Sequence, residues 1–394
     1  MQIFEEVLKY TEEKKIFITL IFDEIEWIAK QGSGFVGDLK AAWIKWQKSG
    51  RVKVIVCGSS NKFFSDHIGG EEKILRGIQT RPAIWVKPFS PKEVRDYICP
   101  KWSLQETTIL YMLTGGIPYY LERIDKSKGF IRGINDAFFT ANSNLLGELD
   151  EMLDLEFNKL GKKAVVKILG SLGQQGKGVK QICEFTGLAK SSVSQVLEKL
   201  LTYKIISIKE PNLFSPKEQY GSRYFIEDLF LNAYFEIFEK QKRNIETNVR
   251  GLIFPSSTQL SLSGYYIPNF TGQAFENFLR YILSNRFKDL SKLYDELLIK
   301  NDDFEIKDFW NEKTQVDLVV YSKLDRLIRT IECKWAKWDP AFISQARKNL
   351  PIPATSKGTF VKNYLLCSSG IPTAAKKEMR KNEMGFLELE TVYD

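Results

Sequence analysis

Apolar and polar residues alternate along two short runs near residue 320, the pattern of strands with one buried face. In the run 316–320 the side chains expected to face the core are those of Val316, Leu318 and Val320. In the run 330–335, Ile331, Cys333 and Trp335 point one way, and Thr330, Glu332 and Lys334 point the other. The polar linker 322–326 between the runs predicts an antiparallel hairpin.

The register of this hairpin follows from the same alternation. If Asp317 pairs with Glu332, the apolar residues of both runs lie on one side, and a slip of one residue destroys the match. The two acids then face each other at a cross-strand Cβ separation of roughly 5 Å. Because two like charges so close are unfavourable, we expect a bound cation or Lys334 to offset them.

A helix is predicted just before the hairpin, over residues 272–287. Its apolar residues recur at helical spacing and make the expected buried face, which consists of Phe275, Phe278, Leu279, Ile282 and Leu283. Glu276 lies at the edge of that face.

Residues 1–140 alternate helical patterns with apolar runs at 16–22, 52–57 and 83–86, which predicts a parallel α/β sheet. The first run ends in Asp23 and Glu24, and the second ends in Gly58-Ser59-Ser60. Two further motifs follow, Lys-Pro-Phe-Ser at 87–90 and Thr-Gly-Gly-Ile-Pro-Tyr-Tyr at 114–120.

The middle of the chain predicts three helices, at 164–172, 179–185 and 191–203, and then two strands, at 205–208 and 223–226. This is the order of a winged helix-turn-helix. The third helix has an inner stripe of Val193, Val196, Leu197, Leu200 and Leu201. The residues near its exposed N-terminal end, where a recognition helix meets DNA, are Lys190, Ser191, Ser192, Ser194 and Gln195. Such modules also serve as protein contacts, and both interpretations stay open.

Composition adds limits to this picture. The chain has 394 residues, 43% hydrophobic and 27% charged, enough for two or three globular domains. The net charge of +8 favours nucleic acid as a partner. Five scattered cysteines without a C-x-x-C spacing indicate reduced thiols and argue against a zinc site. A single histidine, His67, leaves little scope for histidine-based catalysis.

The acid-rich hairpin resembles the PD-(D/E)XK nuclease superfamily, with Asp317 as the first acid and Glu332-Cys333-Lys334 as the E-x-K element. The resemblance implies Mg²⁺ held by Asp317, Glu332 and the Cys333 carbonyl, with Lys334 positioning or activating the attacking water. It also implies that Glu276 holds a metal-bound water. Gln345 matches a helix position where some members carry glutamine. The alternative is a Glu332–Lys334 salt bridge and a Glu276–Arg280 ion pair on solvated faces.

The order of motifs along the whole chain resembles archaeal and bacterial AAA+-type ATPases that carry a winged helix and a nuclease-like C-terminal domain. That resemblance implies that Asp23 orients Mg²⁺, Glu24 polarises water and Ser59 senses the γ-phosphate of ATP. The sequence contains no G-x-x-x-x-G-K-[ST], however, and too few residues precede Asp23 to hold the missing strand and loop. We therefore expect ATP to bind only if that segment is supplied, and no independent ATP hydrolysis.

The fold expected is α/β in three domains: an incomplete P-loop-type domain at 1–155, a winged helix at 156–250 and a restriction-endonuclease-like domain at 251–394. The leading interpretation is a truncated AAA+-type ATPase with a metal-dependent nuclease-like domain. The alternatives are a non-catalytic scaffold that binds DNA or protein, and a fragment of an intact ATPase. DNA is the expected partner, with a protein partner or self-association as a further expectation. Because the apolar run 16–22 is too short to cross a bilayer and no signal peptide is evident, we expect a cytoplasmic protein.

Overall fold

The chain folds into two compact units, Met1–Val86 and Lys87–Asp394. The computed structural model describes residues 2–29, 33–58, 63–64, 84–139, 145, 161–173, 176–202, 205–210, 221–239, 270–300, 303–310, 315–349 and 359–394. The predicted domain boundaries at 155/156 and 250/251 lie outside these described residues.

The first unit is a small α/β layer. Its elements are α1 (Gln2–Lys14), β1 (Ile18–Phe22), α2 (Ile25–Ile28), α3 (Phe35–Ser49) and β2 (Val52–Val56). The two strands pair in parallel, as the sequence predicts, with Ile18 opposite Val52. The buried Trp46 side chain of α3 packs edge-on against Phe4 of α1 and donates a hydrogen bond to its carbonyl, so the two helices share one core.

The prediction of a third strand at 83–86 is wrong for residues 84–86, the part of it that the structure describes. Residues 84–86 belong to no strand, and Ile84 is 91% exposed. Apolarity alone therefore did not identify a strand here, because a strand also requires a hydrogen-bonding neighbour.

The second unit begins with short helices: α5 (Pro91–Glu93), a π-helical turn (Val94–Ile98), α6 (Leu104–Thr114), α7 (Pro118–Glu122) and α8 (Phe130–Phe138). The Gly-Gly motif after α6 has a structural reason. Gly115 ends the helix with a φ of +63°, and a Cβ on Gly116 would lie 2.4 Å from the Phe89 carbonyl oxygen. Glycine is needed there because the backbone of Phe89 approaches so closely: its N–H donates a hydrogen bond to the Gly116 carbonyl, and its carbonyl accepts one from the Tyr111 hydroxyl.

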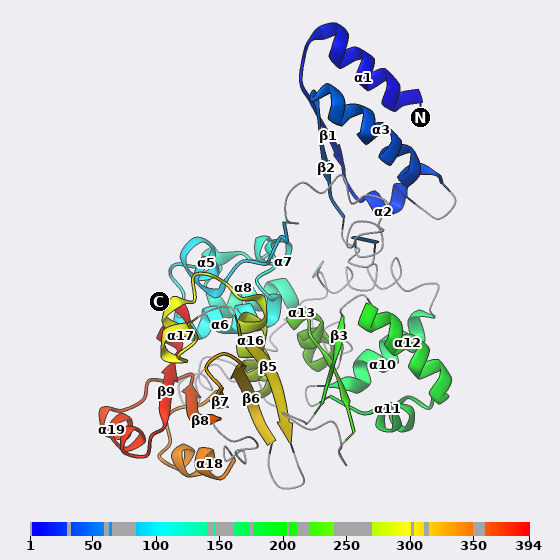
Figure 1. The fold of residues 1–394 in the computed structure, drawn as a ribbon. Helices are drawn as coiled ribbons and strands as arrows, with labels where there is room; N and C mark the ends of the chain where they lie inside the picture. The colour runs from blue at the N-terminus through cyan, green and yellow to red at the C-terminus, as the bar shows by residue number, and fades with distance from the viewer. Residues whose placement is uncertain are drawn as a thin grey trace. The chain divides into compact units, whose positions relative to one another are not determined.

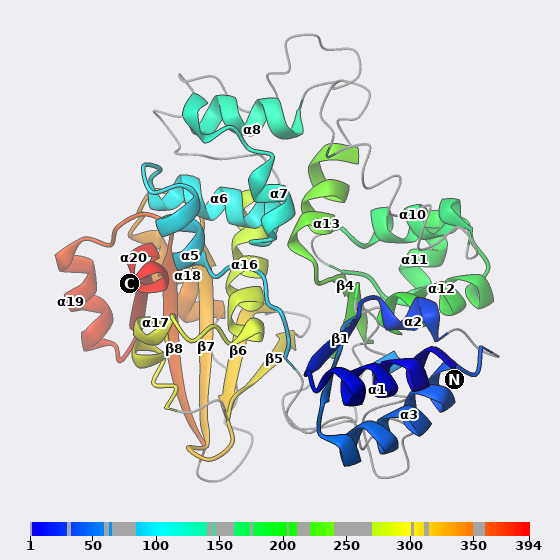
Figure 2. The same ribbon diagram turned by 90° about the horizontal axis from the view of Figure 1, so that it is seen from above.

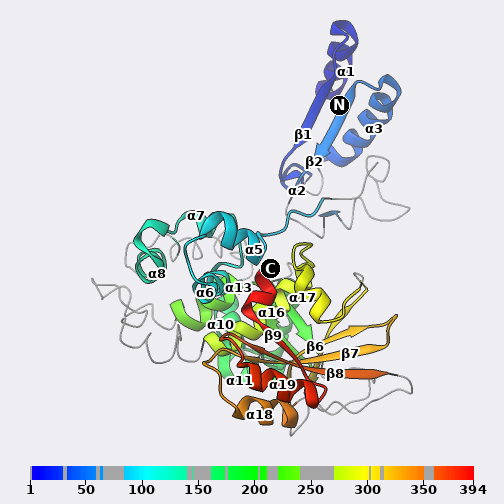
Figure 3. The same cartoon turned by 90° about the vertical axis from the view of Figure 1, so that its left-hand side faces the viewer.

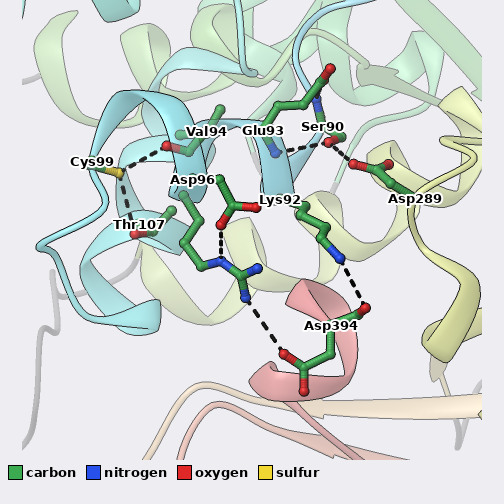
Figure 4. A network of polar contacts seen from close by, with 10 residues as sticks. Ser90, Lys92, Glu93, Val94, Asp96, Cys99, Thr107, Asp289 and Asp394 are labelled. Carbon is green, nitrogen blue, oxygen red and sulfur yellow. Dashed lines mark hydrogen bonds and ion pairs between the residues drawn. The ribbon is translucent and has the colours of Figure 1, made fainter.

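These helices are joined to the C-terminal part of the chain by polar contacts (Figure 4). Ser90 caps α5 and also donates a hydrogen bond to Asp289, while Lys92 binds the main-chain carbonyl of Asp394. Figure 3 shows the C-terminus beside α5 and α17. Tyr393 is buried, and its hydroxyl lies 2.9 Å from the Thr108 hydroxyl of α6. The helices that follow Lys87 therefore pack as part of the second unit.

The middle segment has the predicted order of elements (Figure 2). It consists of α10 (Lys162–Leu172), α11 (Val179–Thr186), α12 (Lys190–Thr202), β3 (Ile206–Lys209) and β4 (Arg223–Ile226). The strands pair antiparallel with Ile206 opposite Ile226. Four residues of the predicted inner stripe of α12 are buried, and Leu201 is half-buried. The chain then continues through α13 (Leu229–Ala233) and the π-helical turn Tyr234–Phe238.

The C-terminal part is a mixed five-stranded sheet with helices on both faces. Its elements are α16 (Thr271–Asn285), α17 (Ser291–Glu296), β5 (Glu305–Trp310), β6 (Gln315–Ser322), β7 (Leu327–Lys334), α18 (Ala341–Asn349), β8 (Phe360–Cys367), α19 (Thr373–Lys381), β9 (Gly385–Glu388) and α20 (Leu389–Tyr393). The strand order is β5-β6-β7-β8-β9 (Figure 1), antiparallel from β5 to β7 and parallel from β7 to β9.

Two hydrophobic clusters enclose this sheet. On one side the predicted apolar face of α16 packs with Leu318, Ile331 and Trp335. On the other, α18 and α19 cover Val319 and Ile328. Because both faces are covered, Thr330 and Glu332 on the polar side of β7 are buried, and Lys334 at its end is half-buried.

Candidate active site

The hairpin β6–β7 has the register that the sequence predicts. Leu318 pairs with Ile331 and Val319 with Thr330, so continuing the same antiparallel register places Asp317 opposite Glu332. The strands pair in this register because their alternate residues then pack together in the core formed with α16.

On its other edge, β6 carries a β-bulge at the position of the first acid. Lys307 of β5 pairs with Val319, but Phe309 pairs with Val316. Two residues, Asp317 and Leu318, therefore lie opposite Asp308 alone. A bulge turns the strand locally and redirects a side chain, a device common next to active sites.

The bulge also corrects one prediction. Val316 was expected to share a face with Leu318 and Val320, yet it packs in the opposite cluster, with Val319 and Ile328. The extra residue breaks the period of two that the expectation assumed.

Four side chains that the sequence singled out converge here, and we call Glu276, Asp317, Glu332 and Lys334 the acid site. The Asp317 carboxylate accepts a hydrogen bond from the Cys333 backbone N–H at 2.8 Å, which ties it to β7 next to Glu332. The Glu332 side chain, 3% exposed, forms an ion pair with Lys334 at 2.7 Å. Part of the alternative interpretation is thus also true: the Glu–Lys salt bridge exists, but on a buried face.

Glu276 reaches the site from the second turn of α16. Gln273, one turn earlier on α16, donates a hydrogen bond to its carboxylate. Arg280, the partner considered for Glu276 in a surface ion pair, binds Asp308 instead at 2.6 Å, with both side chains largely buried. Arg280 also lies 3.5 Å from the Asp317 main-chain oxygen, so it braces the bulge.

Burial and the closeness of three carboxylates shift the pKa values in the acid site. Burial, then the charge of Glu332, raises the pKa of Asp317 from 3.8 to about 7. Burial, followed by the charge of Asp317, raises the pKa of Glu276 well above its usual value. Burial alone would lower the pKa of Lys334, but its hydrogen bond and ion pair with Glu332 prevail and raise it.

Sequence reasoning missed three contributors, Asp308, Lys209 and Arg223. All three line one small cavity together with Glu276 and Asp317. Lys209 and Arg223 come from β3 and β4, 62 and 48 positions before the first residue of α16, and nothing in their local pattern marks them. Only the packing of the middle segment on β5 brings them to the site.

The donor set is compatible with a hard divalent cation. Two carboxylates and the Cys333 carbonyl are oxygen ligands of the kind Mg²⁺ prefers. Throughout the described part of the chain, no three His, Cys, Asp or Glu side chains converge closely enough to hold a metal by themselves. A metal in the acid site would therefore need the main-chain carbonyl and waters in addition to Asp317 and Glu332.

The residues predicted for ATP lie in the first unit. Asp23 and Glu24 are exposed in the turn after β1, and Glu24 has a left-handed φ of +47° with its N–H bound to the Asp23 carboxylate. The neighbouring end of β2 is held by hydrogen bonds between Cys57 and residues Phe22 and Ile25. Ser59 lies outside the described residues.

The residues predicted for DNA contact lie together at the start of α12. Lys190, Ser191, Ser192, Ser194 and Gln195 are all exposed, while Val193 between them is buried. The inner stripe fixes this helix and leaves its polar side to solvent.

Residues 234–349 match a family model described as archaeal and bacterial proteins of unknown function. The matched segment contains the whole acid site. The chain is also similar to an uncharacterized protein of Methanocaldococcus jannaschii, at 24% identity over 288 residues. That alignment covers 73% of this chain and 61% of the archaeal protein. No solved structure matches the chain. None of the described helices is long and apolar enough to cross a membrane.

Proposed function

We propose that residues 270–394 form a restriction-endonuclease-like domain that cleaves DNA phosphodiester bonds with the help of a divalent metal. One observation carries the proposal: the hairpin register and the bulge bring Asp317 against Glu332-Cys333-Lys334. Glu276 joins them from the helix that packs on the same sheet.

The charge distribution supports a cation at this place. Burial, and then the neighbouring carboxylates, raise the pKa of Asp317 and of Glu276, so added positive charge is favourable here, although Lys334 neutralises part of Glu332. A divalent cation bound by Asp317, Glu332 and the Cys333 carbonyl would supply that charge, polarise the phosphate and activate a water.

The protein's own groups then have separate roles. Lys334 keeps its proton because its pKa is raised, so it acts as a hydrogen-bond donor and positive charge that orients water or phosphate, and not as a general base. Glu276, at the edge of the site, would accept a hydrogen bond from a water. Asp317 is fixed by the Cys333 N–H, which restricts its carboxylate to one orientation.

The test is DNA cleavage with Mg²⁺ or Mn²⁺ by the full chain and by Asp317→Ala, Glu332→Ala and Lys334→Met. We expect each change to lower the rate by at least about a hundredfold, the usual size for loss of such a group. Asp325→Asn, in the exposed turn of the same hairpin, is the matched control and should keep full activity. Cleavage that survives both acid substitutions would overturn the proposal.

DNA binding without cleavage is the second candidate, favoured by the exposed cluster at the start of α12. Fluorescence anisotropy with labelled duplex DNA should show weaker binding for Lys190→Ala and Gln195→Ala. Binding that depends on these residues in a protein without metal-dependent cleavage would support a DNA-associated scaffold. Unchanged affinity in both variants would instead assign this segment to protein contacts.

For the first unit we propose a supporting role without independent ATP hydrolysis. The sequence offers the acids Asp23 and Glu24 at a strand end but no Gly-rich loop with a lysine to bind the phosphates. Release of phosphate from ATP by the purified chain, abolished in Glu24→Gln, would contradict this.

A further inference from the structure

Two cationic side chains lie opposite each other on the strand pair β3–β4. Lys209 of β3 pairs directly with Arg223 of β4, so both side chains leave the pair on the same face. The pair has a fixed position, because Ile206 and Ile226 at its other end are buried in the main core. Figures 1 and 2 both show it next to β5. Like charges directly opposite each other destabilise a strand pair, and an anion between them would offset the repulsion.

Neither cation has an anionic partner among the residues that the structure describes. Within that part of the chain, the side chains of Lys209 and Arg223 form no hydrogen bond and no ion pair. Each lies over an aromatic ring instead: the Lys209 ammonium is 4.0 Å from the centre of the Phe225 ring, and the Arg223 guanidinium carbon is 4.9 Å from that of Trp310. Lysine is rarely buried without a partner, yet Lys209 is only 8% exposed.

Both cations line the cavity that the acid site shares. Glu276 and Asp317 form part of the same wall, and the cavity reaches solvent at the exposed residue Gln315. Its volume is about 20 Å³, room for about one water-sized group. A single non-bridging phosphate oxygen has this size, so it can enter the cavity while the rest of the phosphate stays on the solvent side, next to the half-buried Arg223.

The charge of Lys209 is available at neutral pH. Burial, followed by the charge of Arg280, lowers the pKa of Lys209 to about 8, while the carboxylates of Glu227 and Asp308 act in the opposite direction. The ammonium therefore keeps its proton at pH 7. Arg280, the third cation of the cavity, is already paired with Asp308 at 2.6 Å. Lys209 and Arg223 are thus the two cations that remain for an anion from outside.

We propose that Lys209 and Arg223 form a phosphate-binding subsite that holds a phosphodiester of DNA beside the acid site. DNA is the occupant we infer because the subsite shares its cavity with Glu276 and Asp317, two carboxylates of the proposed nuclease centre. The inference rests on the proposed nuclease function for its purpose. Contact with phosphate is measured by DNA binding without metal, so absence of cleavage and absence of the subsite are distinguished.

The test is the salt dependence of DNA binding by the full chain at pH 7 in EDTA, followed by fluorescence anisotropy of a labelled duplex. A cation that contacts a phosphate contributes about one to the slope of log affinity against log salt concentration. Lys209→Met keeps the length of the side chain and removes its charge. We expect Lys209→Met and Arg223→Met each to lower the slope by about one. Lys209→Arg, which keeps the charge, should retain the parent slope.

Two controls separate phosphate contact from other causes. Lys323→Met removes the same charge from the exposed turn of the β6–β7 hairpin and should leave the slope unchanged. Hydrogen exchange of the β3 and β4 amides should be the same in Lys209→Met and the parent. An unaltered slope in Lys209→Met overturns the proposal, and so does an equal fall in Lys323→Met, because net charge alone would then explain it. A fall that Lys209→Arg shares, with faster exchange in both variants, also overturns it, because disturbed packing would be the cause.

Discussion

Asparagine in place of Asp317 should stabilise the metal-free protein. The carboxyl pKa rises from 3.8 to about 7 on folding. At about 1.36 kcal/mol per pKa unit, this shift corresponds to about 4 kcal/mol of stability lost at pH 8. Asparagine is nearly isosteric and still accepts the Cys333 N–H, but it exchanges a charge-assisted hydrogen bond for a neutral one at a cost of about 1–2 kcal/mol. We therefore expect a net gain of about 2 kcal/mol at pH 8.

The sign of the pH dependence follows from the same shift. Because the folded pKa lies above the unfolded one, the contribution of Asp317 is fully present below about pH 4 and is lost as pH rises through 7. The advantage of Asp317→Asn should thus be small at pH 4 and reach its full size by pH 8. With a saturating divalent cation the order should reverse, because only the parent carboxylate binds and is stabilised by the ligand.

Hydrogen exchange in urea provides the assay, read on the peptide 315–334 with EDTA present. This peptide reports the β6–β7 hairpin even if the two units unfold separately. Asp325→Asn, in the exposed turn, should change the free energy by less than about 0.5 kcal/mol. If Asp317→Asn is less stable than the parent at pH 8 in EDTA, the acid is already well compensated by Lys334 and Arg280, and the electrostatic argument for a cation fails.

Three further predictions concern the rest of the molecule. Arg329 is fully buried and donates hydrogen bonds to main-chain carbonyls at the end of α17. Arg329→Met should therefore lower the free energy of unfolding by about 3 kcal/mol in the same exchange assay. A loss under about 1 kcal/mol would show that these carbonyls find other donors. Tyr393→Phe removes the buried hydrogen bond to Thr108. It should lower the free energy of opening of α6 amides by about 1 kcal/mol and leave that of α12 unchanged. Equal effects in both helices would speak against a local contact. Lys190→Ala should reduce the slope of log affinity for DNA against log salt concentration by about one, and an unaltered slope would place Lys190 away from phosphate.

The sequence predicted those parts of the fold in which side-chain period and structure agree. The hairpin register around Leu318 and Ile331 followed from alternation, and the buried face of α16 followed from its 3.6-residue spacing. The bulge at Asp317 did not follow, because an inserted residue leaves the apolar count unchanged and is decided by pairing with β5. The strand predicted at 83–86 was wrong for its described residues, because a run of apolar residues alone does not specify a pairing strand.

For the acid site, the sequence identified the residues that belong to one local motif and missed those that arrive through tertiary packing. Asp317, Glu332 and Lys334 lie on the two strands of one hairpin, so strand geometry was enough to bring them together, whereas Glu276 was expected at the site only from the family resemblance. The role of Lys209 depends on the middle segment packing against β5, a contact that no local spacing encodes. Motifs at 87–90 and 114–120 illustrate the same limit: they indicated an ATPase-like order, while in the structure Ser90 bonds to Asp289 in the turn after α16 and the Gly115 carbonyl accepts a hydrogen bond from Tyr281 within α16.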